Sequence, residues 1–267
     1  MNPVEVLRGD GPVILGQPHG GTFVPDDIAA RLNDNGLALA DTDWHISQLY
    51  DGLLAGASVV RATFHRYVID ANRDPAGQSL YPGQNTTGLC PLTDFDGRPI
   101  WREGAEPTPT DIAHRTENFH APYHATLATE VARVKARHGV AVVYDCHSIR
   151  SRIPFLFEGE LPALNIGTDN GKTCAASLQN LTYEFAASSP YATVLNGRFR
   201  GGWTTRHYGT PATGSHAIQM EIAQSAYLAD ERAPWTYSAA KAAKLRPWLA
   251  DVLRVIADEA LELAHNG

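Results

Sequence analysis

The sequence has few of the features that would place a protein in or beyond a membrane. Its first residues, Met1-Asn-Pro-Val-Glu-Val-Leu-Arg8, contain neither the basic start nor the apolar core of a signal peptide. No stretch approaches the roughly 20 apolar residues of a membrane span. We therefore expect a cytoplasmic protein that is neither exported nor inserted into a membrane.

Cysteine and positive charge are also scarce. The three cysteines, Cys90, Cys146 and Cys174, are odd in number and lack the spacing of zinc-finger or redox motifs, so we interpret them as free thiols in a reducing compartment. The formal net charge of −7 argues against a nucleic-acid-binding surface. An anionic ligand would have to be met by locally placed arginines.

The remaining composition is that of an ordinary globular protein, with 43% hydrophobic and 19% charged residues. A chain of 267 residues is long enough to bury a sizeable core, and we expect a single α/β domain over residues 1–267. Apolar runs of strand length alternate with helical patterns. The expected strands cover residues 12–15, 58–63, 67–70, 154–157, 164–168, 191–195 and 216–222, and the main expected helices cover 42–54, 110–138, 173–187 and 238–265.

The stretch Val140–Arg150 reads as a further strand that ends in reactive side chains. Because side chains alternate faces along a strand, Asp145 and His147 should share one face, and Cys146 should lie on the other beside Tyr144. Ligands of open α/β sheets bind in the crevice beyond the carboxyl ends of the strands. His147 is therefore a candidate site residue.

His19 follows the expected strand 12–15, in the segment Gln17-Pro-His-Gly-Gly-Thr22. The proline before it favours an extended backbone, and the glycines after it let the chain pass close to a ligand. A ligand histidine and a surface turn histidine are both compatible with this setting.

Asp41 and Asp43 begin the expected helix 42–54, with Asp41 as its N-cap. Asp43 precedes Ile46 and Tyr50 by three and seven residues, which places its carboxylate on a partly buried flank where it needs a partner. The alternative is that both acids only complement the helix N-terminus.

Arg73 follows the expected strand 67–70, and Arg206 lies in the loop that follows strand 191–195. A guanidinium binds a carboxylate through paired hydrogen bonds, so both are candidate clamps for an acidic substrate. Arg73 could instead pair with Asp70 or Asp74.

Residues 76–109 are rich in Gly, Pro, Thr and Asp and show no periodicity. An ordered loop of this length usually forms a lid or a wall of a binding site, with disorder as the alternative. In the next expected helix, Pro122 should cause a kink or start a second helix. Its His120 and His124 lack the intervening Glu of a His-Glu-x-x-His motif and read as surface or packing residues.

Glu221 stands among apolar neighbours on the expected strand 216–222. A buried glutamate is costly unless it is paired or close to a metal ion. Glu221 is therefore a candidate functional residue, with a buried salt bridge to an arginine as the alternative.

Taken together, His19, Asp43, His147 and Glu221 lie at or near the ends of elements. Two imidazoles and a carboxylate form the ligand set of many catalytic zinc sites, and a further carboxylate would serve as general base. The same ligands also suit iron, cobalt or manganese.

Several blocks of the sequence resemble the N-formylglutamate amidohydrolase (N-formylglutamate deformylase) family over about residues 13–256. The blocks are Pro18-His-Gly-Gly21, Asp41-Thr-Asp-Trp44 with Leu49-Tyr50, Asp70-Ala-Asn-Arg-Asp-Pro75, Asp145-Cys-His-Ser148 and Gln219-Met-Glu221. The resemblance implies a mixed central sheet flanked by helices, as in zinc carboxypeptidases. It also implies metal-dependent hydrolysis of N-formyl-L-glutamate to L-glutamate and formate, the final step of one route of histidine degradation.

Matched position by position, the resemblance implies that His19, Asp43 and His147 bind one divalent metal ion, with zinc as the expected metal and Asp41 as an alternative to Asp43. Glu221 would be the catalytic carboxylate. Arg73 and Arg206, together with Arg150, would hold the two carboxylates of the small acidic substrate.

Other functions remain open at the level of sequence. The chain could be another metal-dependent deacylase of N-acyl amino acids, a muramoyl-alanine-type amidase, or a non-catalytic protein that binds acidic ligands. A serine hydrolase built on Ser148 is disfavoured because the sequence has no Gly-x-Ser-x-Gly elbow. The oligomeric state is open.

Overall fold

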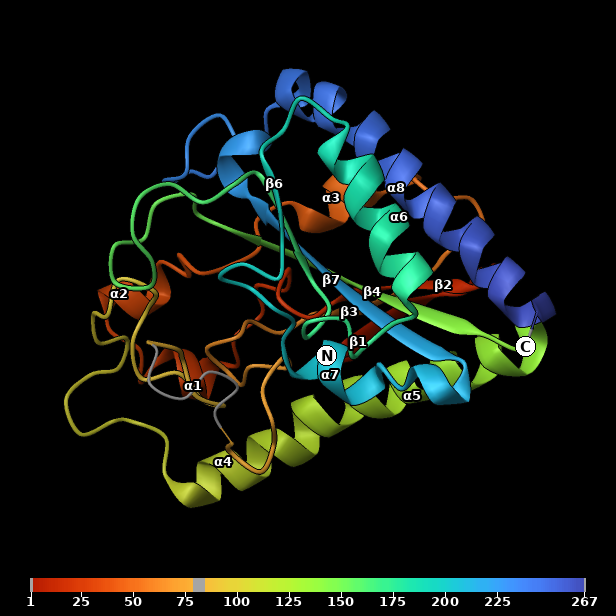
Figure 1. Cartoon of the computed structure of the whole chain (residues 1–267). Helices are drawn as coiled ribbons and strands as arrows, with labels where there is room; N and C mark the ends of the chain where they lie inside the picture. Colours follow the sequence, from red (N-terminus) through yellow and green to blue (C-terminus); the bar gives the residue numbers. More distant parts are fainter. Residues whose placement is uncertain (1, 79–84, 267) are drawn as a thin grey trace.

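A computed structural model describes residues 2–78 and 85–266, and a seven-stranded mixed sheet forms its centre (Figure 1). The strand order is β1-β3-β2-β4-β7-β5-β6. The predicted α/β class, with a mixed central sheet flanked by helices, is confirmed. The strands are β1 (Val4–Leu7), β2 (Val13–Gln17), β3 (Ser58–Ala62), β4 (Ala141–Ile149), β5 (Leu164–Gly167), β6 (Thr193–Leu195) and β7 (Ser215–Ala223).

The middle of the sheet is parallel. β2 pairs with β3 and β4, and β4 pairs with β7, all in the parallel sense, whereas β1 and β5 run antiparallel to β3 and β7. Every residue of β2, β4 and β7 is buried, as expected of strands covered on both faces. Because these three strands run the same way, the residues at their carboxyl ends meet in one crevice.

Helices cover both faces of the sheet (Figure 1). One face carries α3 (Ile46–Tyr50), α6 (Ala176–Ala187) and α8 (Ala239–Asn266). The other face carries α4 (Pro109–Arg115), α5 (Ala121–His138) and α7 (Trp203–Tyr208). Two short helices, α1 (Asp26–Ala29) and α2 (Asp34–Leu37), follow β2, and 3-10 turns cover Pro211–Thr213 and Gln224–Ala226.

Alternate residues of β4 enter two different hydrophobic cores. Tyr144 and Cys146 pack in the core under α3, α6 and α8, whereas Val143 packs in the core under α5. Asp145 and His147 continue the series that contains Val143, because side chains alternate along a strand. The predicted separation of Cys146 from Asp145 and His147 is confirmed.

The helix predicted over 110–138 is one continuous helical run with a π-helical turn inside it. α4 ends at Arg115, the π-helical turn covers Thr116–His120, and α5 begins at Ala121. Thr108 and Asp111 form a capping box that fixes the start of the run. The π-turn stands directly before Pro122, which lacks the amide proton that a regular helix uses.

The predicted strand Tyr67–Asp70 is wrong, because this segment lies in a turn outside the sheet. The place beside β3 is taken by β1, which pairs Val6 with Val60 and was not predicted. Tyr67, Val68 and Ile69 are nevertheless fully buried. Their apolar character therefore reflects packing against the core and not participation in the sheet.

Two further predictions are corrected by the structure. The segment Pro154–Phe157 is a turn, in which the amides of Leu156 and Phe157 both donate to the carbonyl of Ile153. The helix predicted over 42–54 contains only α3, because His45 has a left-handed backbone with φ of 59°. Asp43 therefore lies in the turn 41–45 before α3.

The long loop predicted over 76–109 reaches α4 without any strand or helix in its described part, and residues 79–84 lie outside the described residues. Isolated bridges connect Leu32 with Trp101 and Thr93 with Pro99. Among residues 2–78 and 85–266, no helix combines the length and apolar character of a membrane span.

We expect Leu127→Ala to destabilise the protein by about 2–5 kcal/mol, because Leu127 of α5 is fully buried against the sheet and its truncation leaves a cavity. The free energy of unfolding from urea denaturation measures this loss. Thr129→Ala, on the exposed side of the same helix, is the control and should change stability by less than about 0.5 kcal/mol. Equal losses in the two variants would contradict the assigned packing face of α5.

Candidate metal and active site

His19 lies in the turn that follows β2, and its side chain is only 2% exposed. Gly21 lets this turn pass close to the neighbouring backbone, because a Cβ there would come within 2.4 Å of the main chain of Thr63. The His19 carbonyl accepts a hydrogen bond from the amide of Asp43. The alternative that His19 is a surface turn histidine is therefore wrong, because its side chain is buried.

The turn 41–45 places its two acids in different environments. The Asp43 carboxylate faces the two site histidines and accepts a hydrogen bond from the amide of Ser148 at 3.0 Å. Asp41 instead accepts hydrogen bonds from the Tyr67 hydroxyl and the Phe95 amide at 2.8 and 2.9 Å, and burial raises its pKa to about 6. Asp43, and not Asp41, therefore belongs to the histidine cluster.

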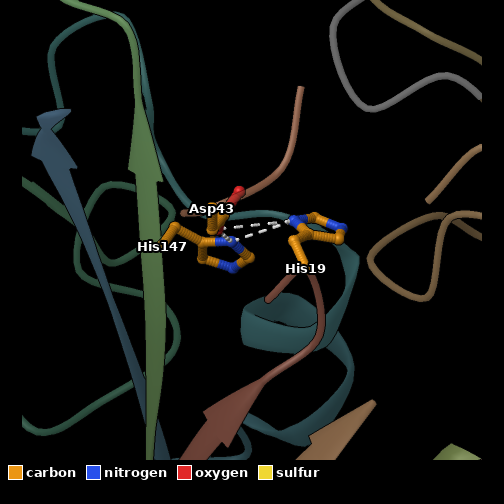
Figure 2. A group of neighbouring side chains, drawn as sticks. All are labelled: His19, Asp43 and His147. Carbon is orange, nitrogen blue, oxygen red and sulfur yellow. Dashed lines mark hydrogen bonds and ion pairs between the residues drawn. The ribbon is translucent and has the colours of Figure 1, made fainter. Parts of the chain in front are cut away.

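His19, Asp43 and His147 form a buried cluster in which one potential ligand atom from each residue lies within 4.8 Å of the others (Figure 2). The Nδ1 atoms of the two histidines are 3.1 Å apart. The Asp43 Oδ2 atom lies 3.3 Å from Nδ1 of His147 and 3.9 Å from Nδ1 of His19. Two nitrogen ligands of a tetrahedral zinc ion, each at about 2.0–2.1 Å from it, are separated by roughly 3.3 Å. The observed spacing suits such an ion.

A buried carboxylate engages the outer nitrogen of each histidine. Asp70 lies 2.7 Å from Nε2 of His19, and Asp145 lies 3.0 Å from Nε2 of His147. Because an ionised carboxylate can only accept, each Nε2 carries a proton, and each Nδ1 is the nitrogen that faces Asp43. When neither Nδ1 carries a proton, both offer a lone pair beside the Asp43 carboxylate, which is the arrangement of metal-binding histidines supported by carboxylates. These donors fit a divalent metal ion.

The surroundings of the two histidines shift their pKa values in opposite directions. Burial and the nearby Arg66 lower the pKa of His19 to about 4, which favours its neutral form. Burial alone would lower the pKa of His147, but Asp145 and Asp43 raise it well above its usual value. Burial would raise the pKa of Asp43, but the hydrogen bond with His147 holds it below its usual range.

Arg66 adds a positive charge beside this cluster. Its NH2 group lies within hydrogen-bonding distance of both ring nitrogens of His19 and 3.5 Å from the Asp70 carboxylate. Its guanidinium also lies over the Phe95 ring, 4.9 Å from the centroid. Sequence reasoning missed Arg66, because it belongs to no periodic pattern and to none of the family blocks.

Glu221 stands beside His147, since the two residues are register partners in the parallel pair β4–β7. It is 7% exposed, and burial raises the pKa of its carboxyl to about 8, while His147 acts in the opposite direction. Among residues 2–78 and 85–266, no arginine lies within ion-pair distance of it, so the alternative of a buried salt bridge finds no support. Two residues earlier, Gln219 accepts a hydrogen bond from the Gly202 amide at 2.7 Å.

A cavity opens above the cluster and contains about 620 Å³ of space between its atoms, part of it continuous with solvent. His19, Asp43, His147 and Glu221 all line it. Its other walls come from three arginines, residues 85–87 of the long loop, and apolar side chains. These residues include Arg66, Arg73, Arg198, Asn85, Thr86, Thr87, Phe95, Leu156 and Phe199.

The three arginines predicted to bind substrate lie in different places. Arg73 lines the cavity, donates to the carbonyl and hydroxyl of Thr87, and lies 3.6 Å from Asp70. Arg150 pairs with Asp96 at 3.1 Å, and Arg206 donates to the Gly201 carbonyl and lies 3.5 Å from Asp169. Neither Arg150 nor Arg206 is among the described residues that line the cavity.

Asn72 also contacts the cluster and was missed as a site residue. Its amide nitrogen lies 3.1 Å from Nε2 of His147, and its oxygen accepts a hydrogen bond from the Thr204 amide at 2.8 Å. Gly202 makes room for it, because a Cβ there would meet the Asn72 side chain at 2.3 Å. The only signal for Asn72 in the sequence was its position between Asp70 and Arg73 in one short polar block.

Sequence comparison relates this chain to one family. The family model for N-formylglutamate amidohydrolase matches residues 11–228. An N-formylglutamate deformylase of Pseudomonas aeruginosa is 45% identical over 263 residues, which cover 97% of this chain and 95% of that relative. An N-formylglutamate deformylase of Pseudomonas putida is 45% identical over 232 residues, which cover 86% of each.

Solved structures agree with this relationship. The crystal structure of N-formylglutamate amidohydrolase from Ralstonia eutropha JMP134 matches with a TM-score of 0.79 and 25% identity, covering 96% of this chain and 97% of that one. Gene product Atu2144 from Agrobacterium tumefaciens matches with a TM-score of 0.74 at 19% identity, covering 97% and 96%. The second match bears on the fold alone.

The different environments of Asp43 and Asp41 generate a prediction about metal binding. We expect Asp43→Ala to lower the zinc content of the purified protein after equilibration with limiting zinc, because one of three potential ligands is lost. Asp41→Asn should keep the zinc content of the unchanged protein, since Asp41 contacts Tyr67 and Phe95 and not the histidines. Elemental analysis of both variants measures the difference, and the reverse order would assign Asp41 to the metal.

Proposed function

The chain belongs to the N-formylglutamate amidohydrolase family, and from this premise we propose that it hydrolyses N-formyl-L-glutamate to L-glutamate and formate with the help of one divalent metal ion. The observation that carries the metal-dependent part is the convergence of His19, Asp43 and His147 at the floor of the cavity. The position of this reaction at the end of a histidine degradation route remains a prediction from the resemblance.

His19, Asp43 and His147 would hold the ion through Nδ1, a carboxylate oxygen and Nδ1. Zinc is the proposed metal, because a ligand set of two nitrogens and one carboxylate would suit it. When bound, such an ion supplies Lewis acidity, which activates water and polarises a carbonyl oxygen. Asp70 and Asp145 keep both imidazoles oriented by holding the protons on their outer nitrogens.

Glu221 is the proposed proton carrier. It lines the cavity beside His147 and pairs with no arginine in the described chain, so its carboxylate is available to a water molecule on the cavity side. A nearby dication would favour the ionised form of this carboxyl and oppose the effect of burial, as a general base requires. Glu221 would take the proton from the attacking water and return it to the departing amine nitrogen.

Arg73 is the proposed clamp for a substrate carboxylate, and Arg66 and Arg198 add positive charge to the same cavity. A guanidinium already held by Thr87 and Asp70 loses little freedom when it binds a carboxylate. Roles for Arg150 and Arg206 remain predictions, and the positions of both outside the cavity wall favour Arg73. The wall formed by residues 85–87 and Phe95 would limit the size of the acyl group.

The alternative functions are less well supported. The Ser148 hydroxyl contacts the Tyr227 hydroxyl at 2.7 Å and the Gln224 amide at 3.4 Å, and no histidine of the described chain activates it as in a serine hydrolase. A non-catalytic binding protein would have no need for Glu221 beside the metal cluster. Another metal-dependent deacylase or a muramoyl-alanine-type amidase differs from the proposal only in substrate, which the assay below distinguishes.

We expect the zinc-loaded protein to release formate from N-formyl-L-glutamate, and much less acid from N-acetyl-L-glutamate or a muramoyl-alanine fragment. Glu221→Gln should keep its zinc and lose about 100-fold or more in kcat, because it cannot accept a proton. Formate release and zinc content are measured on the same samples, before and after treatment with a chelator. A fully active Glu221→Gln variant would remove Glu221 from the reaction, and activity that survives complete metal removal would refute metal dependence.

Arg73→Met should lower kcat/KM for N-formyl-L-glutamate by about 10–100-fold, chiefly through KM, because a charge-assisted hydrogen-bonded pair contributes about 1.5–3 kcal/mol. Arg206→Met provides the comparison, since Arg206 lies outside the cavity wall and should have a smaller effect. Steady-state kinetics of both variants test the ranking. A larger loss in Arg206→Met would move the carboxylate clamp to α7.

A further inference from the structure

The short segment Asp70–Arg73 supplies three groups to the site. The Asp70 carboxylate holds Nε2 of His19, the Asn72 amide contacts Nε2 of His147, and Arg73 lines the cavity. The segment belongs to no strand or helix. No regular backbone ladder therefore fixes the positions of these three side chains.

Buried backbone groups outside regular structure must find other partners. The Asp70 amide donates to the Leu89 carbonyl at 2.7 Å, and the Asn72 amide donates to the Asp70 side chain at 2.8 Å. The Asp70 carbonyl accepts from the Arg73 amide at 3.2 Å, and the Asn72 carbonyl accepts from the Arg73 guanidinium at 3.0 Å, which leaves the carbonyls of Ala71 and Arg73. Each of them is met by a histidine side chain from the helical run on the other side of the segment.

His124 of α5 places Nε2 at 2.7 Å from the Ala71 carbonyl, and His120 places Nε2 at 3.0 Å from the Arg73 carbonyl. A carbonyl can only accept, so both histidines donate and both carry the proton on Nε2. Their relative exposures of 2% for His120 and 9% for His124 show that these hydrogen bonds are shielded from bulk water. In this environment a missing donor leaves a carbonyl without a partner, which is costly.

The spacing of the two contacts matches the geometry of the run. The histidines are four residues apart on consecutive turns, with ring centroids 4.5 Å apart, and they reach carbonyls that are two residues apart in the turn 70–73. His120 is the last residue of the π-helical turn, a type of turn that is frequent at functional sites. Trp203 of α7 packs against both imidazoles, with ring centroids 5.5 Å from that of His120 and 4.5 Å from that of His124.

We propose that His120 and His124 are positioning residues of the metal site, which hold the Asp70–Arg73 backbone so that Asp70 and Asn72 meet the two metal-binding histidines. This inference rests on the proposed metal-dependent function. It gives the two histidines, which sequence reasoning treated as surface or packing residues, a role that depends on a nitrogen donor. α7 supports the same segment independently, through the hydrogen bond from the Thr204 amide to Asn72.

Substitutions that separate the donor from the shape of the ring test the proposal. His120→Leu and His124→Leu remove the N–H group, whereas His120→Gln and His124→Gln keep an amide donor close to the position of Nε2. We expect each leucine variant to bind zinc about 2- to 10-fold more weakly than the unchanged protein, the effect of losing one neutral hydrogen bond, and each glutamine variant to bind nearly as tightly as the unchanged protein. The measurement is the zinc dissociation constant of metal-free protein, by competition with a chromophoric chelator.

His114→Leu is the matched control, because His114 is an exposed histidine of the same helical run. It should leave the zinc dissociation constant unchanged. Urea unfolding of every metal-free variant reports the purely structural contribution. If a leucine variant does not fold, asparagine replaces it, since its amide ends short of the carbonyl.

The outcomes separate this inference from the function on which it rests. Unchanged protein that binds no zinc would overturn both. Tight zinc binding by the unchanged protein and equally tight binding by the leucine variants would overturn the positioning role alone. Equal weakening in the leucine and glutamine variants would also overturn it, because the ring and not the donor would then be responsible.

Discussion

The site depends on one constraint, which is that each of two buried imidazoles has its outer nitrogen engaged by a carboxylate. Asp70 and Asp145 hold protons on Nε2 of His19 and His147, so both Nδ1 atoms point to the same small volume as the Asp43 carboxylate. When neither Nδ1 carries a proton, three acceptors lie within 4.8 Å of one another, and they repel one another unless a positive charge lies between or beside them. The neighbouring guanidinium of Arg66 and the fit to a divalent ion both follow from this crowding.

The sheet supplies the rigid half of the site. β4 places Asp145 and His147 on one face, and β7 places Glu221 beside His147 through a parallel register. The other half comes from irregular segments, namely the turn after β2, the turn 41–45 and the block 70–73. Such segments hold their shape only where side chains satisfy their backbone groups, which accounts for the buried polar residues around the site, such as Asp70, Asn72 and Asp145.

The cavity is lined by positively charged side chains, although the chain as a whole is acidic. The protein carries a net charge of −7, yet the cavity above the His19, Asp43 and His147 cluster is lined by Arg66, Arg73 and Arg198. Local placement of guanidinium groups can therefore attract an anionic ligand to an otherwise acidic protein. The same arginines neutralise the buried acids near them, as in the pairs that Asp70 forms with Arg66 and Arg73.

The sequence by itself determined the elements whose signal is local. The alternation in 140–150 correctly separated His147 and Asp145 from Cys146, and the placement of His19 and His147 after or within buried strands led to the histidine cluster. Only the tertiary structure selected Asp43 over Asp41, brought Asp70, Asn72 and Arg66 to the histidines, and left Arg150 and Arg206 outside the cavity wall. Periodicity records which face of an element is buried, whereas contacts between irregular segments depend on how the chain folds back on itself, and no local pattern encodes that.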